Sequence, residues 1–304
     1  MSRSVPASIV LVGPTATGKS ALALALARLG GDIELISADS MQVYRGMDIG
    51  TAKPTAAERA EISHHVIDLV DPHQSFSVSE FQRAAREAMA DVAARGRRCV
   101  VVGGTGLYVQ ALVDELVLPG QYPLVRGELE QETDTVALHR RLTQCDPLAA
   151  SRMEPTNRRR VLRALEVTLG AARPFSSFGP GLGTYAPTAH RLFGLDLGRE
   201  QLDERIERRY HRQLVEGFLE EVHGLLQTPG GLSVTATQAL GYKELLAHLR
   251  GEQTLAEALA LAIGRTRRFA RRQQRWFRRD SRIVWLDANA VSADPTAAAE
   301  RLLA

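Results

Sequence analysis

The chain has few cysteines and no long hydrophobic run. Only two of its 304 residues are cysteine, Cys99 and Cys145, too few and too far apart for a disulfide framework or a zinc site. No apolar stretch is long enough to span a bilayer, and the N-terminus lacks the apolar segment of a signal peptide. We therefore expect a cytoplasmic protein without a membrane partner.

The composition is otherwise that of an ordinary globular protein, with 44% hydrophobic and 24% charged residues. The net charge of +3 is small but unevenly distributed. From Arg265 to Arg282 there are nine arginines and a single acid, Asp280. Such a concentration is typical of a nucleic-acid-binding surface, and equally of a solvated helix face. Charge alone does not separate these two interpretations.

Eight residues near the N-terminus match the G-x-x-x-x-G-K-[ST] phosphate loop. They are Gly13, Pro14, Thr15, Ala16, Thr17, Gly18, Lys19 and Ser20. The motif lies between the apolar run Ile9–Val12 and an Ala/Leu-rich helical run, the strand–loop–helix setting that gives the pattern its meaning. The glycines let backbone N–H groups point at a phosphate, Lys19 adds a charge, and the Ser20 hydroxyl is a ligand for Mg²⁺. The motif does not say whether the phosphate belongs to a nucleotide.

Short apolar runs alternate with helical patterns in the first third of the chain. The expected strands are Ile9–Val12, Glu34–Ser37, Val66–Leu69 and Cys99–Val102. This alternation predicts a parallel sheet with crossover helices, in which ligands gather at the carboxyl ends of the strands. Four segments then meet at one crevice: 13–20, 39–40, 68–71 and 103–106.

These patterns predict an α/β fold with a P-loop NTPase-like parallel sheet. We expect the first part of this core at residues 1–112 and a mainly helical insertion at 113–190. Residues 191–304 are expected to complete the core and to add basic helices.

The C-terminal part has two long helical patterns, Arg199–Leu226 and Ala256–Arg279. Two apolar runs, His190–Leu197 and Arg282–Asp287, are expected as further strands. In the second helix, apolar residues recur at helical spacing and include the aromatic pair at positions 276 and 277. This pair is therefore expected in the core rather than as a platform for stacked bases.

Asp39 follows an expected strand and begins a long polar segment that ends at Pro54. A carboxylate at a strand end beside a phosphate loop can hold Mg²⁺, accept a proton, hydrogen-bond a ribose, or simply cap a turn. A loop of this length over a crevice is usually functional rather than connecting.

Two further segments argue against nucleotide hydrolysis and against metal binding by histidine. The strand ending at Val102 continues into glycines and Thr105, where many phosphate-loop enzymes carry an acidic Mg²⁺ ligand. This weakens the case for an ordinary nucleotide hydrolase. His64 and His65 would point in opposite directions on a strand, so we assign them no metal.

Six motifs, taken together and in order, resemble those of the bacterial tRNA dimethylallyltransferases, the tRNA isopentenyltransferase family. The resemblance runs from residue 9 to about residue 286. The segment 39–54 is close to diagnostic of the family. The matching segments are 13–20, 36–54, 64–68, 103–108, 163–167 and 238–244.

The resemblance implies transfer of a dimethylallyl group from dimethylallyl diphosphate to N6 of adenosine 37, next to the tRNA anticodon. By this likeness the phosphate loop holds the isoprenoid diphosphate, with Mg²⁺ on Ser20. Asp39 is the candidate base that accepts the N6 proton. Thr105 matches a residue at the reacting end of the channel, and Arg209 matches an arginine that reaches the diphosphate.

The family likeness also assigns contacts to the tRNA anticodon stem-loop, whose target base must leave its stack. The assigned residues are Asp39, Ser40, Met41, Gln42, Thr105, Arg126, Arg159, Arg160, Val161, Leu162, Arg163, Gln238, Ala239, Leu240, Gly241, Tyr242 and Lys243. Residues 154–157 depart from the usual family sequence, which leaves their turn intact but puts a specific polar role in doubt. For residues 173–187 we predict no function, and we expect a monomer.

Three other functions stay open at this stage. A small-molecule phosphate-loop kinase is disfavoured by the missing strand-end acid and by the long segment after Asp39. A relative that prenylates free adenine nucleotides is disfavoured by the helical insertion and the basic C-terminal helix. The third alternative is a non-catalytic RNA-binding protein in which the phosphate loop is only structural.

Overall fold

The structure, a computed structural model, describes residues 8–304 and divides into two compact units. The first unit comprises the chain up to Asp114 together with Pro187–Ala304, and the second is Glu115–Ala186. The second unit thus begins and ends inside the insertion expected at 113–190. Residues 1–7, the start of the expected core, lie outside the described residues.

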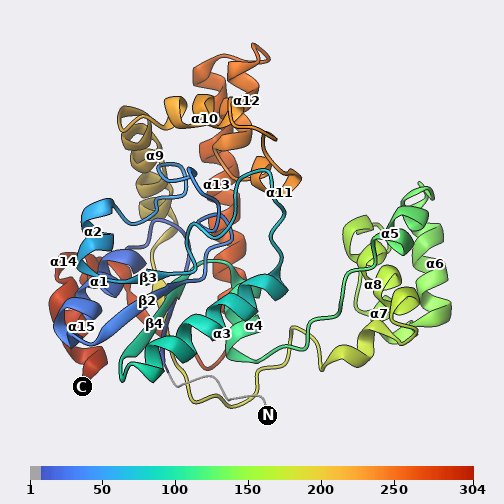
Figure 1. The fold of residues 1–304 in the computed structure, drawn as a ribbon, viewed down its shortest axis with the longest axis horizontal. Coiled ribbons are helices and arrows are strands. Elements are labelled where there is room, and N and C mark those ends of the chain that lie inside the picture. Colours follow the sequence, from blue (N-terminus) through green and yellow to red (C-terminus); the bar gives the residue numbers. More distant parts are fainter. Residues whose placement is uncertain (1–7) are drawn as a thin grey trace. The chain divides into compact units, whose positions relative to one another are not determined.

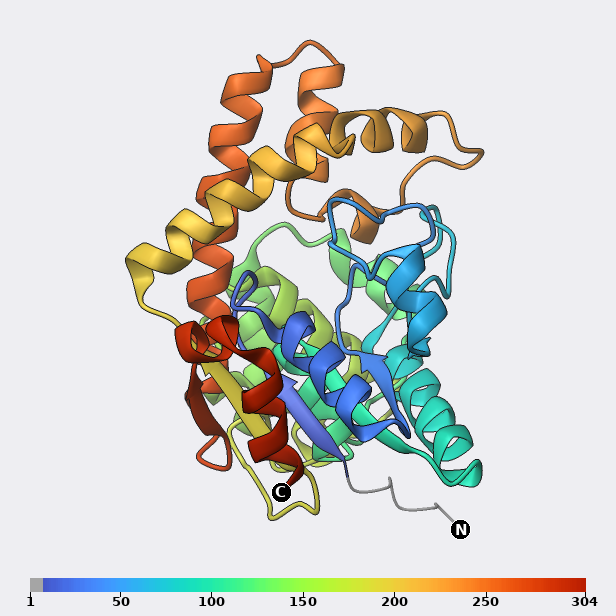
Figure 2. The same ribbon diagram turned by 90° about the vertical axis from the view of Figure 1, so that its left-hand side faces the viewer.

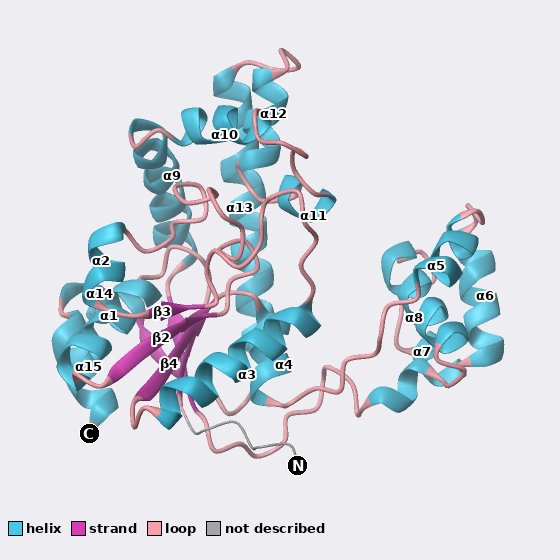
Figure 3. Cartoon of the chain, in the orientation of Figure 1, coloured by secondary structure: helices cyan, strands magenta, loops and turns pink. Residues whose placement is uncertain are grey.

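A six-stranded sheet forms the centre of the first unit (Figure 3), with the strand order β3-β2-β4-β1-β5-β6. Every neighbouring pair of strands is parallel, which confirms the predicted α/β class. Because parallel neighbours require crossover connections, helices cover both faces. The strands are β1 (Ile9–Val12), β2 (Ile33–Ser37), β3 (His64–His65), β4 (Arg98–Gly103), β5 (Arg191–Asp196) and β6 (Val284–Asp287).

Helices α1 (Lys19–Gly30) and α3 (Val78–Ala94) both pack on β2 and β4, from opposite faces of the sheet (Figure 1). On the first face α1 also contacts α15 (Pro295–Leu303), and on the second α3 contacts α4 (Gly106–Val113). Both faces are apolar and buried, as expected for a parallel sheet. Their largest fully buried side chains include Leu11, Leu22, Leu26, Leu35, Ile36, Phe81 and Met89.

The prediction of a third strand at Val66–Leu69 is wrong. The strand ends at His65, and Val66 and Asp68 have φ angles of +62° and +53°, which a β-strand does not allow. The chain instead turns so that residues 68–70 hydrogen-bond to residues 42–45: Asp68 N–H donates to the Gln42 carbonyl over 3.1 Å. Burial of Val66 together with this pairing outweighs the local preference for a strand.

Residues 199–226 form two helices rather than one. The break between α9 (Arg199–Val215) and α10 (Phe218–Leu226) lies at Gly217, whose φ of +99° no helix interior contains. Figure 2 shows α9, in yellow, crossing the long orange helix α13 (Leu255–Phe277), with which it is in contact. None of the helices within residues 8–304 is both long and apolar enough to cross a membrane.

The second unit has its own apolar core, formed by residues including Leu138, Leu142, Val161 and Leu165. Its last long helix is capped by Asn157, whose side chain accepts a hydrogen bond from Arg160 N–H. Its helices are α5 (Pro123–Glu130), α6 (Thr135–Cys145), α7 (Pro147–Ser151), α8 (Arg158–Gly170) and the 3₁₀ helix η1 (Phe175–Phe178). The remaining helices of the first unit are α2 (Ala56–Glu61), α11 (Val234–Thr237), α12 (Tyr242–Leu249) and α14 (Ala288–Ala293).

A buried carboxylate joins the first unit's sheet to α3. The side chain of Glu34, in β2, is only 1% exposed and accepts two hydrogen bonds from Arg95, of 2.5 and 2.9 Å. Arg97 lies 2.9 Å and His65 2.6 Å from the same carboxylate. Hydrogen bonding by Arg95, more than that by His65, lowers the pKa of Glu34 to about 2, against the opposing effect of burial.

We expect Glu34→Gln to lower the free energy of unfolding by about 2 kcal/mol at neutral pH, because it removes charged hydrogen bonds. Since the pKa of Glu34 is lowered by folding, its contribution is complete above the ordinary value of 4.5 and is lost as the pH falls towards about 2. Wild-type and variant stabilities should therefore converge in acid. Urea unfolding at several pH values measures this, with Asp32→Asn, which weakens an exposed pair with Arg98, as the control. Equal differences at every pH would contradict it.

Candidate active site

The phosphate loop connects β1 to α1 and has a backbone that glycine alone adopts without strain at two positions. Gly13 has a φ of +141°, and a Cβ there would lie 2.8 Å from the carbonyl oxygen of Leu195 in β5. Gly18 has a φ of +94° and directly precedes α1. The Thr17 hydroxyl donates to the Pro14 carbonyl over 2.9 Å, which closes the loop internally. The glycine spacing of the motif therefore follows from the close approach of β5 and the entry into α1.

Two cationic side chains converge on this loop. Lys19 Nζ donates to the Pro14 carbonyl over 2.6 Å, and Arg209 Nη1 donates to the Thr15 hydroxyl over 2.8 Å. Burial lowers the pKa of Lys19 to about 8; the charge of Asp39 opposes this shift and that of Arg209 adds to it. Burial also lowers the pKa of Arg209. An anion held by the loop would relieve both groups, so the local electrostatics favour a bound anion.

Gln273, from α13, bridges the phosphate loop to the turn after β4. Its side-chain oxygen accepts from Thr15 N–H over 2.9 Å, and its nitrogen donates to the Gly104 carbonyl over 2.8 Å. A Cβ at Gly104 would lie 2.3 Å from this nitrogen, and one at Gly106 2.3 Å from the Trp276 ring. The glycines after β4 thus accommodate side chains of α13. Helical spacing in the sequence gave no sign of this bridge.

Asp39 and Thr105 follow neighbouring strands and lie close together. Ser40 N–H donates to the Thr105 hydroxyl over 3.1 Å, and Thr105 N–H donates to the Ala38 carbonyl over 3.3 Å. One oxygen of Asp39 accepts from Met41 N–H over 2.8 Å, which fixes the orientation of the carboxylate. Because β4 pairs with both β1 and β2, these two residues and the phosphate loop share one edge of the sheet.

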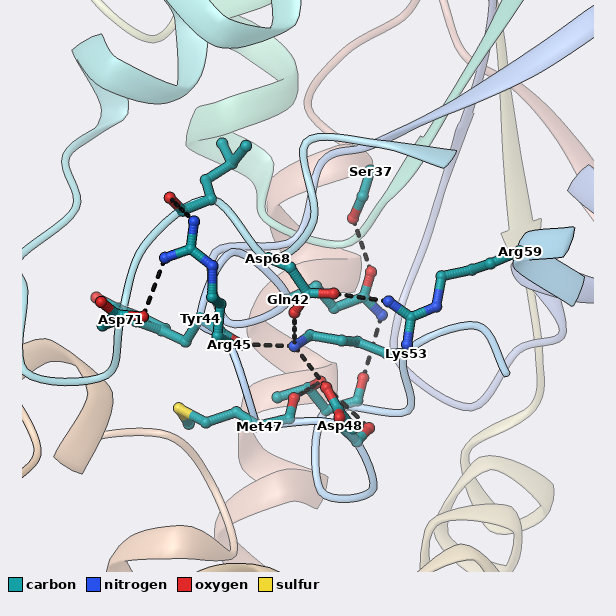
Figure 4. Close-up of polar contacts among 12 residues, drawn as sticks. Ser37, Gln42, Tyr44, Arg45, Met47, Asp48, Lys53, Arg59, Asp68 and Asp71 are labelled. Atoms are coloured by element: carbon teal, nitrogen blue, oxygen red, sulfur yellow. Dashed lines mark hydrogen bonds and ion pairs between the residues drawn. The ribbon is translucent and has the colours of Figure 1, made fainter. Parts of the chain in front are cut away.

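Residues 39–54, hereafter the acceptor loop, are held by a buried ammonium group (Figure 4). Lys53 Nζ lies 2.6 Å from Asp48 Oδ1 and 2.5 Å from Asp68 Oδ1, and it donates to the Tyr44 carbonyl over 2.5 Å. Arg59 pairs with the other oxygen of Asp68, at 2.6 Å. Sequence analysis did not single out Lys53, because nothing in the sequence of a polar loop reveals that its one lysine is buried.

A carboxylate from α10 holds the tip of the acceptor loop. Glu221 accepts from three successive N–H groups, those of Asp48, Ile49 and Gly50, over 2.7 to 3.2 Å, and from the Tyr242 hydroxyl over 2.5 Å. A Cβ at Gly50 would lie 2.2 Å from the Phe218 ring, so only glycine allows this contact. Glu221 too was missed, because its partners lie far away in the sequence.

Among the C-terminal residues assigned to tRNA, Gln238 and Lys243 are both exposed. Gly241 is buried, as are Ala239 and Tyr242, which are 3% and 0% exposed. Tyr242 packs edge-on against Phe218 and donates to Glu221. The buried side chains of this segment therefore serve packing and offer no contact to RNA. Leu240 is partly buried and lies between them in the turn before α12.

In the second unit, Arg159 and Arg160 are exposed at the start of α8, but Val161 and Leu162 lie in the unit's core at 0% and 2% exposure. The side chains of the latter two are thus unable to contact RNA. Arg163 pairs with Glu166 at 2.7 Å and donates to the Pro119 carbonyl. Similarly, Arg126 is paired with Glu130 at 2.6 Å.

The nine arginines of residues 265–282 divide into two groups. Five are paired with carboxylates: Arg265, Arg267, Arg271, Arg278 and Arg282. The other four, among residues 8–304, form no ion pair: Arg268, Arg272, Arg275 and Arg279. These four, the arginine stripe, recur at i, i+4, i+7 and i+11 and thus share one face of α13 and its C-terminal extension. Phe277 is 3% exposed, as expected of a core residue.

The described residues contain no group of three or more His, Cys, Asp or Glu side chains that could hold a metal ion. His65 pairs with Glu34, and His64 Nδ1 lies 2.7 Å from the Ile62 carbonyl, so both histidines have structural partners. Ser20, at the start of α1, is exposed.

The fold and the site define a phosphate-loop α/β protein. Two cationic side chains, Lys19 and Arg209, form a site for an anion at the loop, next to the carboxylate of Asp39. Comparison with known families makes the class specific. The family model for IPP transferase matches residues 42–280, and that for isopentenyl transferase matches residues 7–71. The chain therefore belongs to the IPP transferase family, which confirms the predicted resemblance.

Relatives of similar length support the assignment. The tRNA dimethylallyltransferase of Acidothermus cellulolyticus is 48% identical and covers 99% of this chain and 95% of its own, and that of Geobacter metallireducens is 46% identical and covers 92% of each. The crystal structure of tRNA delta(2)-isopentenylpyrophosphate transferase from Staphylococcus epidermidis aligns over 98% of both chains with a TM-score of 0.71 and 34% identity. A eukaryotic dimethylallyltransferase acting on tRNA aligns over 98% of this chain and 77% of its own, with a TM-score of 0.80 and 29% identity.

We expect the affinity of the free protein for dimethylallyl diphosphate to fall as the pH rises through about 8, where Lys19 loses its proton. Binding must then take up a proton, and affinity decreases by up to about tenfold per pH unit. Calorimetry in buffers of different ionisation enthalpy measures the uptake. Lys19→Met should bind weakly with no pH dependence in this range, while Arg28→Met, which removes an exposed charge, should match the wild type. A pH dependence that persists in Lys19→Met would contradict the assignment.

Proposed function

We propose that the protein transfers a dimethylallyl group from dimethylallyl diphosphate to N6 of adenosine 37 in tRNA, giving N6-dimethylallyladenosine and diphosphate. The observation that carries the proposal is the pair of cations at the phosphate loop, Lys19 and Arg209, next to the carboxylate of Asp39. The names of the full-length relatives supply the substrate class.

The reaction needs one bond made and one broken. The N6 lone pair, delocalised into the adenine ring, forms a C–N bond to the allylic carbon as the C–O bond to diphosphate breaks. Asp39 accepts the N6 proton, and the Met41 N–H on one of its oxygens holds it towards the amine. The charge that develops on the leaving diphosphate is stabilised by Lys19 and Arg209. Thr105, hydrogen-bonded to Ser40, lines the reacting end.

The site offers one protein ligand for Mg²⁺. The ion usually keeps several waters and takes one or two protein ligands besides the phosphate oxygens. Ser20 offers an exposed hydroxyl at the start of α1 and is the residue we propose to hold it. When bound, Mg²⁺ would neutralise charge on the diphosphate.

Recognition of tRNA combines the acceptor loop with exposed polar side chains. The target base must leave its stack to reach a site at strand ends. Ser40 is hydrogen-bonded to Thr105 at that site, and Asp39 and Met41 are its chain neighbours. Both ends of the Gln42 amide are bonded within the protein, so we assign Gln42 to ordering this segment. We further propose contacts from Arg126, Arg159, Arg160, Arg163, Gln238 and Lys243. We further propose that the protein is a monomer, that it acts in the cytoplasm, and that its substrate region is the anticodon stem-loop.

Incubation with dimethylallyl diphosphate and Mg²⁺ tests the function. An unmodified anticodon stem-loop is compared with AMP and ATP as acceptors, and the product is analysed by mass spectrometry. We expect a gain of one dimethylallyl group on the stem-loop adenosine alone. Modification of AMP in place of the stem-loop would indicate a free-nucleotide prenyltransferase, phosphate transfer from ATP a kinase, and RNA binding without any product a non-catalytic protein.

Asp39→Asn tests the base. The amide keeps an oxygen for Met41 N–H but is unable to take a proton, so we expect turnover to fall roughly 10²- to 10⁴-fold. Affinity for the stem-loop should change by less than about threefold, which is roughly the effect of one weak exposed interaction. Asp32→Asn, an equivalent change at the exposed pair with Arg98, serves as the control. Weakened RNA binding with near-normal turnover would remove the assigned role.

The arginine stripe tests the electrostatic interaction with RNA. Replacing its four residues with glutamine should weaken tRNA binding and reduce the slope of log affinity against log salt by about 0.7 to 0.9 for each phosphate that the variant no longer neutralises. The KM for dimethylallyl diphosphate should not change, because the stripe forms no bond to the phosphate loop. The matched control replaces Arg28 and Arg98, which are exposed but paired. An unchanged salt slope would assign the stripe to a solvated face.

A further inference from the structure

Lys53 has an unusual environment for a side chain that is not part of the phosphate site. It is 1% exposed, and each of its three ammonium hydrogens has an acceptor: the Tyr44 carbonyl, Asp48 and Asp68 (Figure 4). Arg59 balances the second oxygen of Asp68. Burying an ammonium group costs free energy unless its partners are complete, so a fully satisfied cluster at this position indicates a specific requirement.

The ammonium joins three segments that are separate in the chain. Tyr44 lies early in the acceptor loop, Lys53 is near its end, and Asp68 follows β3. Asp68 has a φ of +53°, a strained conformation for a residue other than glycine. The backbone pairing of residues 42–45 with residues 68–70 runs alongside and depends on that conformation. Lys53 thus closes the acceptor loop on itself and anchors it to the sheet.

A short series of contacts leads from this closure to the proposed base. The carbonyls of Thr51 and Ala52, next to Lys53, each accept from the Gln42 amide over 3.2 Å. The other end of this amide accepts from the Ser37 hydroxyl over 2.7 Å, at the end of β2. Met41, next to Gln42, donates its N–H to Asp39. Every step is a hydrogen bond or a link between chain neighbours. A second route runs through Tyr44, which accepts from Lys53 and donates its N–H to the Met41 carbonyl over 3.3 Å.

The tip of the loop is fastened independently. Glu221 holds the N–H groups of residues 48–50, and Gln213 donates to the Ile49 carbonyl over 2.5 Å. Loss of Lys53 would therefore leave the tip of the loop attached to the helices, while the two ends of the loop would no longer be held together. Among residues 8–304, the phosphate loop, Lys19 and Arg209 share no hydrogen bond with Lys53 itself. Arg209 does donate to the Gly50 carbonyl, over 3.4 Å, at the tip that Glu221 and Gln213 hold.

We propose that Lys53 is a positioning residue for the transfer reaction: through the Gln42 amide it holds the acceptor loop in the conformation that directs Asp39 at the adenine amine. The inference rests on the proposed function. It assigns to Lys53 an effect on the proton-accepting step, with the binding of the diphosphate left unaltered.

Lys53→Met keeps much of the buried stem but removes the charge. We expect turnover on the stem-loop to fall roughly 10- to 100-fold, the scale of a misplaced catalytic group, while the affinity for dimethylallyl diphosphate stays within about twofold of wild type. Arg98→Met, which removes an exposed cation at the amino end of β4, is the matched control. Asp48→Asn, at a half-exposed partner, should give a smaller loss in the same direction and serves if Lys53→Met does not fold.

A double-mutant cycle with Asp39→Asn separates positioning from general stabilisation. If Lys53 acts through Asp39, adding Lys53→Met to Asp39→Asn should lower turnover by less than about threefold more. Full additivity, an equal loss of diphosphate affinity, or wild-type turnover in both Lys53→Met and Asp48→Asn would overturn the inference. Absence of any prenylation by the wild-type protein would instead overturn the proposed function.

Discussion

The backbone of the phosphate loop is the constraint on which the rest of the first unit depends. Gly13 lies so close to β5 that a single Cβ would meet the Leu195 carbonyl. The turn that follows β1 therefore packs directly against β5. Two helices far away in sequence are then bonded to the same residue of that turn: Thr15 accepts from Arg209 of α9 and donates to Gln273 of α13. The C-terminal helices are therefore fixed relative to the phosphate loop by direct contacts with Thr15, through its side-chain hydroxyl for α9 and its backbone N–H for α13.

Patterns that repeat over short distances were enough to predict the fold. Alternating apolar runs indicated the parallel sheet and, within one residue, the ends of β1, β2 and β4. The failures occurred where long-range contacts outweigh local preference. Val66 and Asp68 look like a strand in sequence, but their positive φ angles serve the pairing with the acceptor loop. Gly217, a single residue, divides one expected helix into two.

The site was predictable only where a motif carries its own chemistry. The phosphate loop, Asp39 and Thr105 follow strands that the sequence makes visible, and parallel strands bring their ends together. Lys53, Glu221 and Gln273 were not predictable, because each acts on backbone groups that only the folded chain brings near. The reverse error came from assigning whole segments: Val161, Leu162 and Tyr242 belong to assigned RNA-contacting stretches yet are almost completely buried. A motif thus mixes residues selected for chemistry with residues selected for packing.

The charges of this unit distinguish structural from functional cations. Lys53, Arg265 and Arg282 are each matched by carboxylates within the protein. Lys19 and Arg209, by contrast, form no ion pair within residues 8–304, and burial lowers the pKa of both. Folding therefore holds these two cations at a cost in free energy that a bound anion recovers. In the proposed reaction the anion leaves with more negative charge than it carries as an ester. The same two groups would then stabilise the leaving diphosphate more strongly than the substrate, which is the difference that lowers a barrier.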